Sequence, residues 1–244
     1  MYKEHPAFEK PADQNAKIWR YFDFAEFISM LDSKALFFAR ADKLGDPFEG
    51  SYSKANIELR PKVYAFMPEK ILKQLPQIYE KSRRFTLINC WSMSDCESEA
   101  LWKLYLRSEN GVAVQSTFKR LAESFRGYSD NVFIGKVKYA DYETDWIPEG
   151  YSFYPFLHKR KNLAYENELR AVIQRFPLKQ GSWDLDGDIC DVGIYVPVDL
   201  DILVETIVVS PSEGWFLNLV KSIVAKYSLN KVVLPSSLAE KPVY

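Results

Sequence analysis

The chain has 244 residues, carries 32 Lys and Arg against 33 Asp and Glu, and has a formal net charge of −1. This length suits one domain whose core needs no disulfide or metal. The near-zero charge argues against a protein that coats nucleic acid through bulk electrostatics, although a local basic patch is compatible with it. The 2 His and 3 Cys exclude a His-rich zinc site, a four-Cys zinc site and an even set of disulfides.

An odd number of Cys without a recognisable signal peptide predicts a cytoplasmic protein in a reducing compartment. No apolar run approaches the ~18 residues of a membrane span, so no membrane partner is expected. The sequence contains neither the glycine motif of dinucleotide-binding Rossmann folds nor a P-loop, so it gives those chemistries no support.

Residues 1–16 are polar and predict an extended N-terminal arm, and residues 17–244 show no linker or internal repeat. Short aromatic and β-branched runs predict strands at residues 18–22, 35–39, 85–92, 111–116, 132–139, 168–176, 189–196, 202–209 and 231–234. Apolar spacing and capping residues predict helices at 24–31, within 54–84, at 97–106 and from Ser210-Pro211-Ser212-Glu213 onward. This mixture predicts a single mixed α+β domain with a central, largely antiparallel twisted sheet flanked by helices.

Arg20 lies in the apolar segment Ile18-Trp19-Arg20-Tyr21-Phe22, where a buried arginine needs a partner. Two interpretations are open. The side chain either pairs with a carboxylate for structural reasons, or clamps an anion such as phosphate through its planar guanidinium.

The predicted strand that ends in Asn89-Cys90-Trp91-Ser92-Met93-Ser94 presents small hydroxyl side chains at a sheet edge or cleft. Turn chemistry explains Ser94 equally well, because a serine can cap the segment that follows it. A nucleophilic Ser or Cys is disfavoured, since His158 is the only credible base. Cys90 and Cys96 are therefore expected to be apolar filler residues.

The segment Tyr165-Glu166-Asn167-Glu168-Leu169-Arg170 contains two carboxylates two residues apart. In a strand both side chains would point to the same face. Their like charges would then raise the pKa of one of them unless cations or a substrate compensated the charge. Lys159, Arg160 and Lys161 are the candidate partners for two carboxylates that face water.

Two charged regions have plain structural interpretations. Residues 60–84 carry seven basic residues against Glu69 and Glu80, and form either a nucleic-acid-facing patch or a solvated helix face. Residues 184–191 alternate Asp as calcium loops do. They lack the glycine and glutamate spacing of such a loop, which favours an acidic surface loop.

The order of the segments resembles the domain-of-unknown-function 2971 family, whose members are bacterial. The resemblance runs from about residue 18 to the C-terminal strand and is carried by Trp19-Arg20-Tyr21, Ala35-Leu36-Phe37-Phe38, Asp46-Pro47-Phe48-Glu49-Gly50, Cys90-Trp91-Ser92, Leu101-Trp102, Asn110-Gly111-Val112-Ala113-Val114 and Tyr165-Glu166-Asn167-Glu168-Leu169-Arg170. The family name implies no function.

A more remote similarity supplies a chemistry. Arg on a first strand, Ser on a middle strand and Glu-x-Glu on a later strand is similar to the Arg–Ser–Glu order of ADP-ribosyltransferases. The similarity implies that Arg20 would bind the NAD phosphates or ribose. It also implies that Ser92, or as the second choice Ser94, would order the site around the nicotinamide ribose. Glu168 would stabilise the oxocarbenium-like transition state, and Glu166 would orient or deprotonate a nucleic-acid or protein acceptor.

The same similarity implies an aromatic wall for nicotinamide, supplied by Tyr21, Phe38 or Trp91, and no metal is expected. Two other function classes stay open. A metal-dependent nuclease or phosphoesterase would use the carboxylates of Asp46, Glu49, Glu166 and Glu168. A non-catalytic interaction module in phage defence or stress response would bind nucleic acid or protein through residues 60–84. The sequence assigns neither an oligomeric state nor a role to the turn at Asp46–Glu49.

Overall fold

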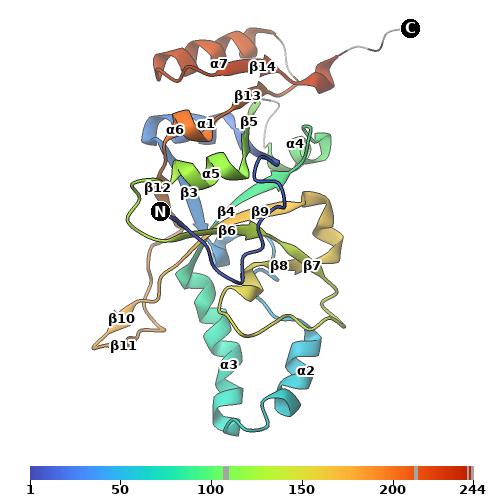
Figure 1. The fold of residues 1–244 in the computed structure, drawn as a ribbon, viewed down its shortest axis with the longest axis vertical. Coiled ribbons are helices and arrows are strands. Elements are labelled where there is room, and N and C mark those ends of the chain that lie inside the picture. Colours follow the sequence, from blue (N-terminus) through green and yellow to red (C-terminus); the bar gives the residue numbers. More distant parts are fainter. Residues whose placement is uncertain (107–109, 212–213, 241, 243–244) are drawn as a thin grey trace.

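The computed structural model describes residues 1–106, 110–211, 214–240 and 242. Its main feature is one mixed sheet flanked by helices, which confirms the predicted α+β class (Figure 1). Side by side, its strands are β1 (Tyr2–Lys3), β6 (Val132–Lys136), β9 (Glu168–Gln174), β4 (Thr86–Met93), β2 (Lys17–Asp23), β5 (Gly111–Thr117), β13 (Thr206–Val209) and β14 (Val232–Pro235). Beside this row, β3 (Ala35–Arg40) pairs with both β4 and β12 (Gly193–Pro197). The β1–β6 and β13–β14 pairs are parallel, and the other pairs in this sheet are antiparallel.

The described helices are α1 (Phe24–Ser33), α2 (Lys54–Val63), α3 (Glu69–Ser82), α4 (Glu99–Tyr105), α5 (Phe118–Ser124), α6 (Leu200–Leu203) and α7 (Gly214–Lys226). Short 3-10 turns are η1 (Ala41–Lys43), η2 (Arg83–Phe85), η3 (Tyr154–Phe156), η4 (Lys161–Glu166) and η5 (Ser237–Ala239). Two small ribbons pair β7 (Lys138–Ala140) with β8 (His158–Arg160) and β10 (Leu178–Lys179) with β11 (Ser182–Trp183).

Helix α1 begins where its capping residues predict. The Asp23 side chain accepts a hydrogen bond from the backbone N–H of Glu26 at 2.9 Å, which satisfies a donor that the first helical turn leaves free. The helix buries Phe27, Met30 and Leu31 against the sheet, and this spacing of three and one is the amphipathic pattern in the sequence.

Several element boundaries differ from the predicted ones. The predicted strand at 202–209 is divided, because Leu200–Leu203 forms the short helix α6 and only Thr206–Val209 joins the sheet. The Asp199 side chain caps α6 by accepting from the Ile202 N–H at 3.0 Å, a local signal that competes with the apolar run. Of the predicted helix start at Ser210-Pro211-Ser212-Glu213, residues 212 and 213 lie outside the described residues.

The N-terminal arm packs on the body of the protein. Its residues Tyr2–Lys3 pair with β6, and the ring of His5 lies 4.7 Å from that of Tyr151 and 5.0 Å from that of Phe153, measured between centroids. Aromatic contacts of this kind explain how a polar segment acquires a fixed position.

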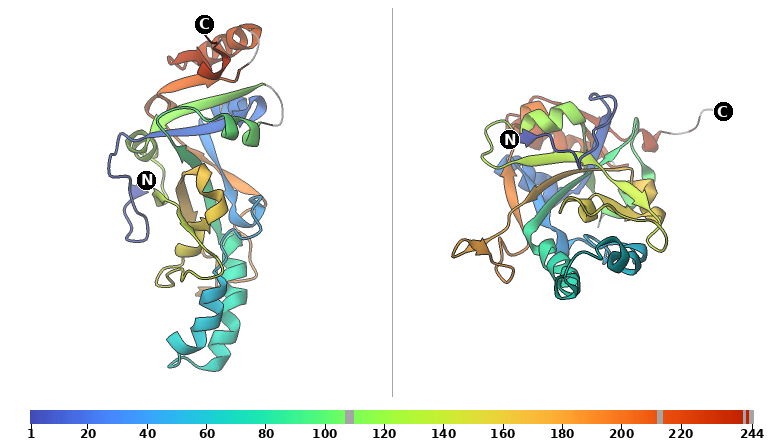
Figure 2. Two further views of the ribbon diagram at one scale, coloured as in Figure 1. Left: turned by 90° about the vertical axis from the view of Figure 1, so that its right-hand side faces the viewer. Right: turned by 60° about the horizontal axis from the view of Figure 1, so that its bottom comes forward.

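Helices α2 and α3 form a helical hairpin that projects from the sheet at one end of the molecule (Figures 1 and 2). Within residues 61–77 of this hairpin no side chain is buried, and Phe66 is 78% exposed. The hairpin therefore carries charged and apolar side chains without a core of its own beyond its base.

Strand β4 has two different neighbours along one edge. At one end Ser92 and Met93 pair with β2, whereas at the other end Leu87 and Ile88 pair with β3. The opposite edge of β4 pairs with β9 without interruption from Thr86 to Ser92. Strand β2 pairs with β5 over its whole length but with β4 only at Ile18 and Trp19, so β2 and β3 diverge and leave a gap beside residues 89–91. We call this divergence the fork.

Candidate functional site

A cavity of about 670 Å³ opens at the fork. Its walls come from β2, β3, β4, β8, β9, α1, α4, η4 and the turn at residues 44–50. The cavity brings together residues that lie far apart in the sequence, including Arg20, Tyr21, Trp91, Ser92, Glu166 and Glu168. Of the residues that the similarity to ADP-ribosyltransferases implies for the site, these six line one space, whereas Phe38 and Ser94 do not.

The sheet register aligns three of the strands that form this cavity. Trp19 of β2 lies opposite Ser92 of β4, and Ser92 lies opposite Glu168 of β9. The hydroxyl of Ser92 donates to the backbone carbonyl of Glu166 at 2.8 Å, so it also holds the turn that precedes β9. Strand pairing thus sets the spacing of the candidate residues, as neighbouring strands lie less than about 5 Å apart.

Arg20 is a half-buried cation at the fork. Its Nη1 donates to the backbone carbonyl of Cys90 at 2.7 Å, a carbonyl that lies in the gap between β2 and β3. Its Nε is buried without a hydrogen-bond partner, and no carboxylate of the described residues lies within salt-bridge distance of the guanidinium. Burial lowers the pKa of Arg20 from its ordinary value. A buried donor without an acceptor suits an anionic or oxygen-rich ligand.

Five buried charged side chains that line the same cavity form an ion-pair chain: Glu49, Arg170, Glu168, Lys159 and Glu166. Arg170 binds Glu49 at 2.6 Å and Glu168 at 2.8 Å, and Lys159 bridges Glu168 at 3.1 Å and Glu166. Three carboxylates against two cations leave the chain with one net negative charge when all are ionised.

The pKa values of the two carboxylates in the Glu-x-Glu segment are shifted in opposite directions. Burial raises the pKa of Glu168, but the charges of Arg170 and Lys159 outweigh it and bring the value to about 2. Burial also raises the pKa of Glu166, and Lys159 offsets only part of that rise. At neutral pH Glu168 is therefore a fixed anion, while Glu166 is the stronger base of the two.

The geometry of the Glu-x-Glu segment differs from the predicted strand. Glu166 ends η4, Asn167 has a left-handed φ of 41°, and only Glu168 belongs to β9. The two carboxylates meet because Lys159 binds both, and all three side chains are buried rather than facing water.

The prediction that Phe38 walls the cavity is wrong. Phe38 is fully buried in the core, with its ring centroid 5.9 Å from that of Phe125, and the alternation of β3 turns Phe37 to the cavity instead. Tyr105 of α4, which the sequence did not single out, lines the cavity with its ring stacked 6.4 Å from that of Tyr21. Tyr105 reaches the cavity because α4 packs beside β2, and this long-range contact has no signal in the local sequence.

Ser94 does not line the cavity among the described residues. Its carbonyl accepts from the indole of Trp19 at 2.9 Å, and its hydroxyl accepts from the Cys96 N–H at 3.3 Å, which is turn chemistry. Cys90 lines the cavity, and burial raises the pKa of its thiol. A protonated thiol is a poor nucleophile, so this position does not favour catalysis by cysteine.

The carboxylates proposed for a metal site are all engaged with cations. Asp46 pairs with Arg160 at 2.9 Å, and the other three belong to the ion-pair chain. Within the part of the chain that the structure describes, no group of three or more His, Cys, Asp or Glu is arranged to hold a metal ion.

Four of the seven basic residues of 60–84 form ion pairs with other described residues. Arg60 is buried against Glu149 at 2.9 Å, Lys73 pairs with Glu69, and Lys81 and Arg84 pair with acids of the 184–191 loop. That loop is accordingly a surface partner of α3 and η2. These pairs reduce the positive charge available to a nucleic acid.

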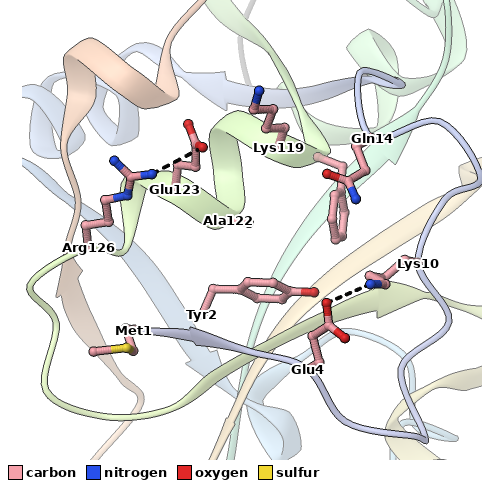
Figure 3. Close-up of a pocket in the computed structure, with 10 residues that line it drawn as sticks. Met1, Tyr2, Glu4, Lys10, Gln14, Lys119, Ala122, Glu123 and Arg126 are labelled. Atoms are coloured by element: carbon pink, nitrogen blue, oxygen red, sulfur yellow. Dashed lines mark hydrogen bonds and ion pairs between the residues drawn. The ribbon is translucent and has the colours of Figure 1, made fainter.

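A second pocket, of about 330 Å³, lies between the N-terminal arm and α5 (Figure 3). There Lys10 pairs with Glu4 at 2.7 Å and Arg126 pairs with Glu123 at 3.3 Å. It contains none of the residues that the sequence proposes for a site.

Comparison with protein family models, with curated proteins and with solved structures finds no match to this chain. None of the described helices is long and apolar enough to cross a membrane.

Proposed function

We propose that the cavity at the fork binds NAD and that the protein transfers ADP-ribose from NAD to a nucleic-acid or protein acceptor. The observation that carries this proposal is the convergence of Arg20, Ser92 and Glu168 on one cavity from three neighbouring strands. The similarity to the Arg–Ser–Glu order of ADP-ribosyltransferases implies roles for these three residues in binding and cleaving NAD. A single ligand in the cavity could contact all three side chains.

The charge distribution of the cavity supports the proposal. Arg20 offers a guanidinium with no carboxylate partner in the described part of the chain, which suits a phosphate. The ion-pair chain carries one excess negative charge when all its groups are ionised, which suits the positively charged nicotinamide ring. NAD carries charges of both signs, and the stacked rings of Tyr21 and Tyr105 offer aromatic surface in the same cavity.

The side chains have distinct roles in this reaction. The Glu168 carboxylate, ionised at neutral pH, accepts a hydrogen bond from a ribose hydroxyl and stabilises positive charge on the sugar as nicotinamide leaves with the bonding electrons. Glu166, the stronger base, accepts the proton that the acceptor nucleophile loses. Ser92 holds the backbone that carries Glu166 and leaves its oxygen free to accept from the ribose.

The test is an assay with NAD labelled in its ADP-ribose part, combined with nucleic-acid or lysate pools. The wild-type protein should release nicotinamide and label an acceptor. Glu168→Gln should lower turnover by about 100-fold while NAD still binds, because one group that stabilises transition-state charge is typically worth this much. Arg20→Gln should weaken NAD binding by about 10-fold, since it removes a charge-assisted contact.

Arg126→Gln is the matched control, because the Arg126 side chain is 71% exposed and lies outside the cavity. Calorimetry should also show that NAD+ binds more tightly than NADH, whose ring is uncharged. A wild-type protein that neither binds NAD nor releases nicotinamide with any pool overturns the proposal. Salt-sensitive nucleic-acid binding that survives Glu168→Gln, without nicotinamide release, would instead support an interaction module.

A further inference from the structure

The turn at residues 44–50 has no role in the reaction as proposed above, yet it forms part of the cavity wall. Its carboxylate Glu49 is 2% exposed, which is rare for an acid. Both of its oxygens accept from Arg170, from Nη1 at 2.6 Å and from Nη2 at 2.7 Å. A bidentate pair of this kind fixes the plane of the guanidinium.

Arg170 has all five of its N–H donors occupied. Besides the two bonds to Glu49, its Nη1 donates to the Phe156 carbonyl at 2.6 Å. Its Nε and Nη2 donate to the two oxygens of Glu168 at 2.8 and 3.3 Å. Since a guanidinium has five donors, Arg170 cannot turn without breaking a buried hydrogen bond. Whatever fixes Arg170 therefore also fixes the carboxylate of Glu168.

The sequence of the turn holds Glu49 in this place. The Asp46 side chain accepts from the Phe48 N–H at 3.0 Å, and the ring of Phe48 stacks under Arg160 at 4.1 Å. Gly50 has a φ of +71°, and a Cβ atom there would lie 2.5 Å from the ring of Phe156, the residue whose carbonyl Arg170 binds. Only glycine meets both conditions without strain.

We propose that Glu49 is a positioning residue for the proposed transfer reaction: by binding Arg170 in a bidentate pair, it orients the Glu168 carboxylate toward the cavity. The inference rests on the proposed function for its catalytic consequence. Glu49 acts through Arg170, whereas Glu168 contacts the sugar.

Two readouts test this role. The first is the ¹⁵N-detected Nε–H signal of Arg170, assigned by its loss in Arg170→Lys, which should exchange slowly with water in the wild-type protein. Glu49→Gln should remove this protection, because the neutral amide cannot hold both Nη groups. The second is turnover, which should fall about 10- to 100-fold with KM for NAD within about threefold, as expected for a misplaced catalytic group.

Glu143→Gln is the matched control, since Glu143 is 74% exposed in its pair with Lys54 and should change neither readout. If Glu49→Gln does not fold, Glu49→Asp retains the charge but shortens the reach, and should show a partial loss of protection and of turnover. A protected Arg170 signal that persists in whichever of these variants folds overturns the positioning role. The signal needs no turnover, so it decides this role even if the wild-type protein never consumes NAD.

Discussion

The ion-pair chain at the fork and the α2–α3 helical hairpin use the same kinds of residue in opposite surroundings. In the ion-pair chain, Arg170 and its two acids have side chains no more than 3% exposed. In the hairpin, Lys73 and Glu69 form their pair with 74% and 80% exposure. The types of charged residue do not distinguish these two regions, because it is burial that decides how strongly an ion pair affects stability.

The largest effect should come from removing the central cation of the ion-pair chain. Arg170→Met leaves Glu49 and Glu168 buried without their main partner, and should lower the free energy of unfolding by about 3–5 kcal/mol. Lys73→Met in the hairpin is the matched change and should have an effect within measurement error. Denaturant unfolding measures both. A loss below about 1 kcal/mol for Arg170→Met would contradict the contrast between the two regions.

A smaller effect is expected from acid. Because the folded pKa of Glu168 lies at about 2, below its ordinary value of 4.5, this group contributes stability that is complete above pH 4.5 and lost as pH falls toward 2. The loss should be on the order of 3 kcal/mol. Chemical unfolding of the wild-type protein and of Glu168→Gln across this range measures it, and the variant should show the weaker acid dependence. Equal slopes would show that the ion pairs do not hold Glu168 ionised.

The smallest effect should come from the hairpin. Phe66→Ser removes a ring that is 78% exposed and should change the free energy of unfolding by less than about 0.5 kcal/mol. Hydrogen exchange should also be fast along residues 61–77 and slow in β4 and β9, because the hairpin has few buried contacts there. Slow exchange in this segment, or a loss above about 1 kcal/mol, would indicate that the hairpin packs against a partner.

The sequence by itself determined the fold class, the helix start at Asp23 and most of the strands, because these depend on local periodicity and capping. It also identified Arg20, because an arginine interrupts an apolar segment there, and Glu166 and Glu168, because two carboxylates lie two residues apart. Ser92 was identified as a hydroxyl residue at the end of a predicted strand. It missed the helix at Leu200–Leu203, where a side-chain cap outweighed an apolar run.

The tertiary structure decided how these residues meet. The divergence of β2 from β3 exposes the Cys90 carbonyl to Arg20, and no local pattern records such a divergence. The pairing of Glu49 with Arg170 joins residues 121 positions apart in the sequence. Because side chains alternate along β3, Phe37 lines the cavity and Phe38 packs in the core. Such choices depend on which strands become neighbours, and long-range pairing is set by the packing of the whole core rather than by any single segment.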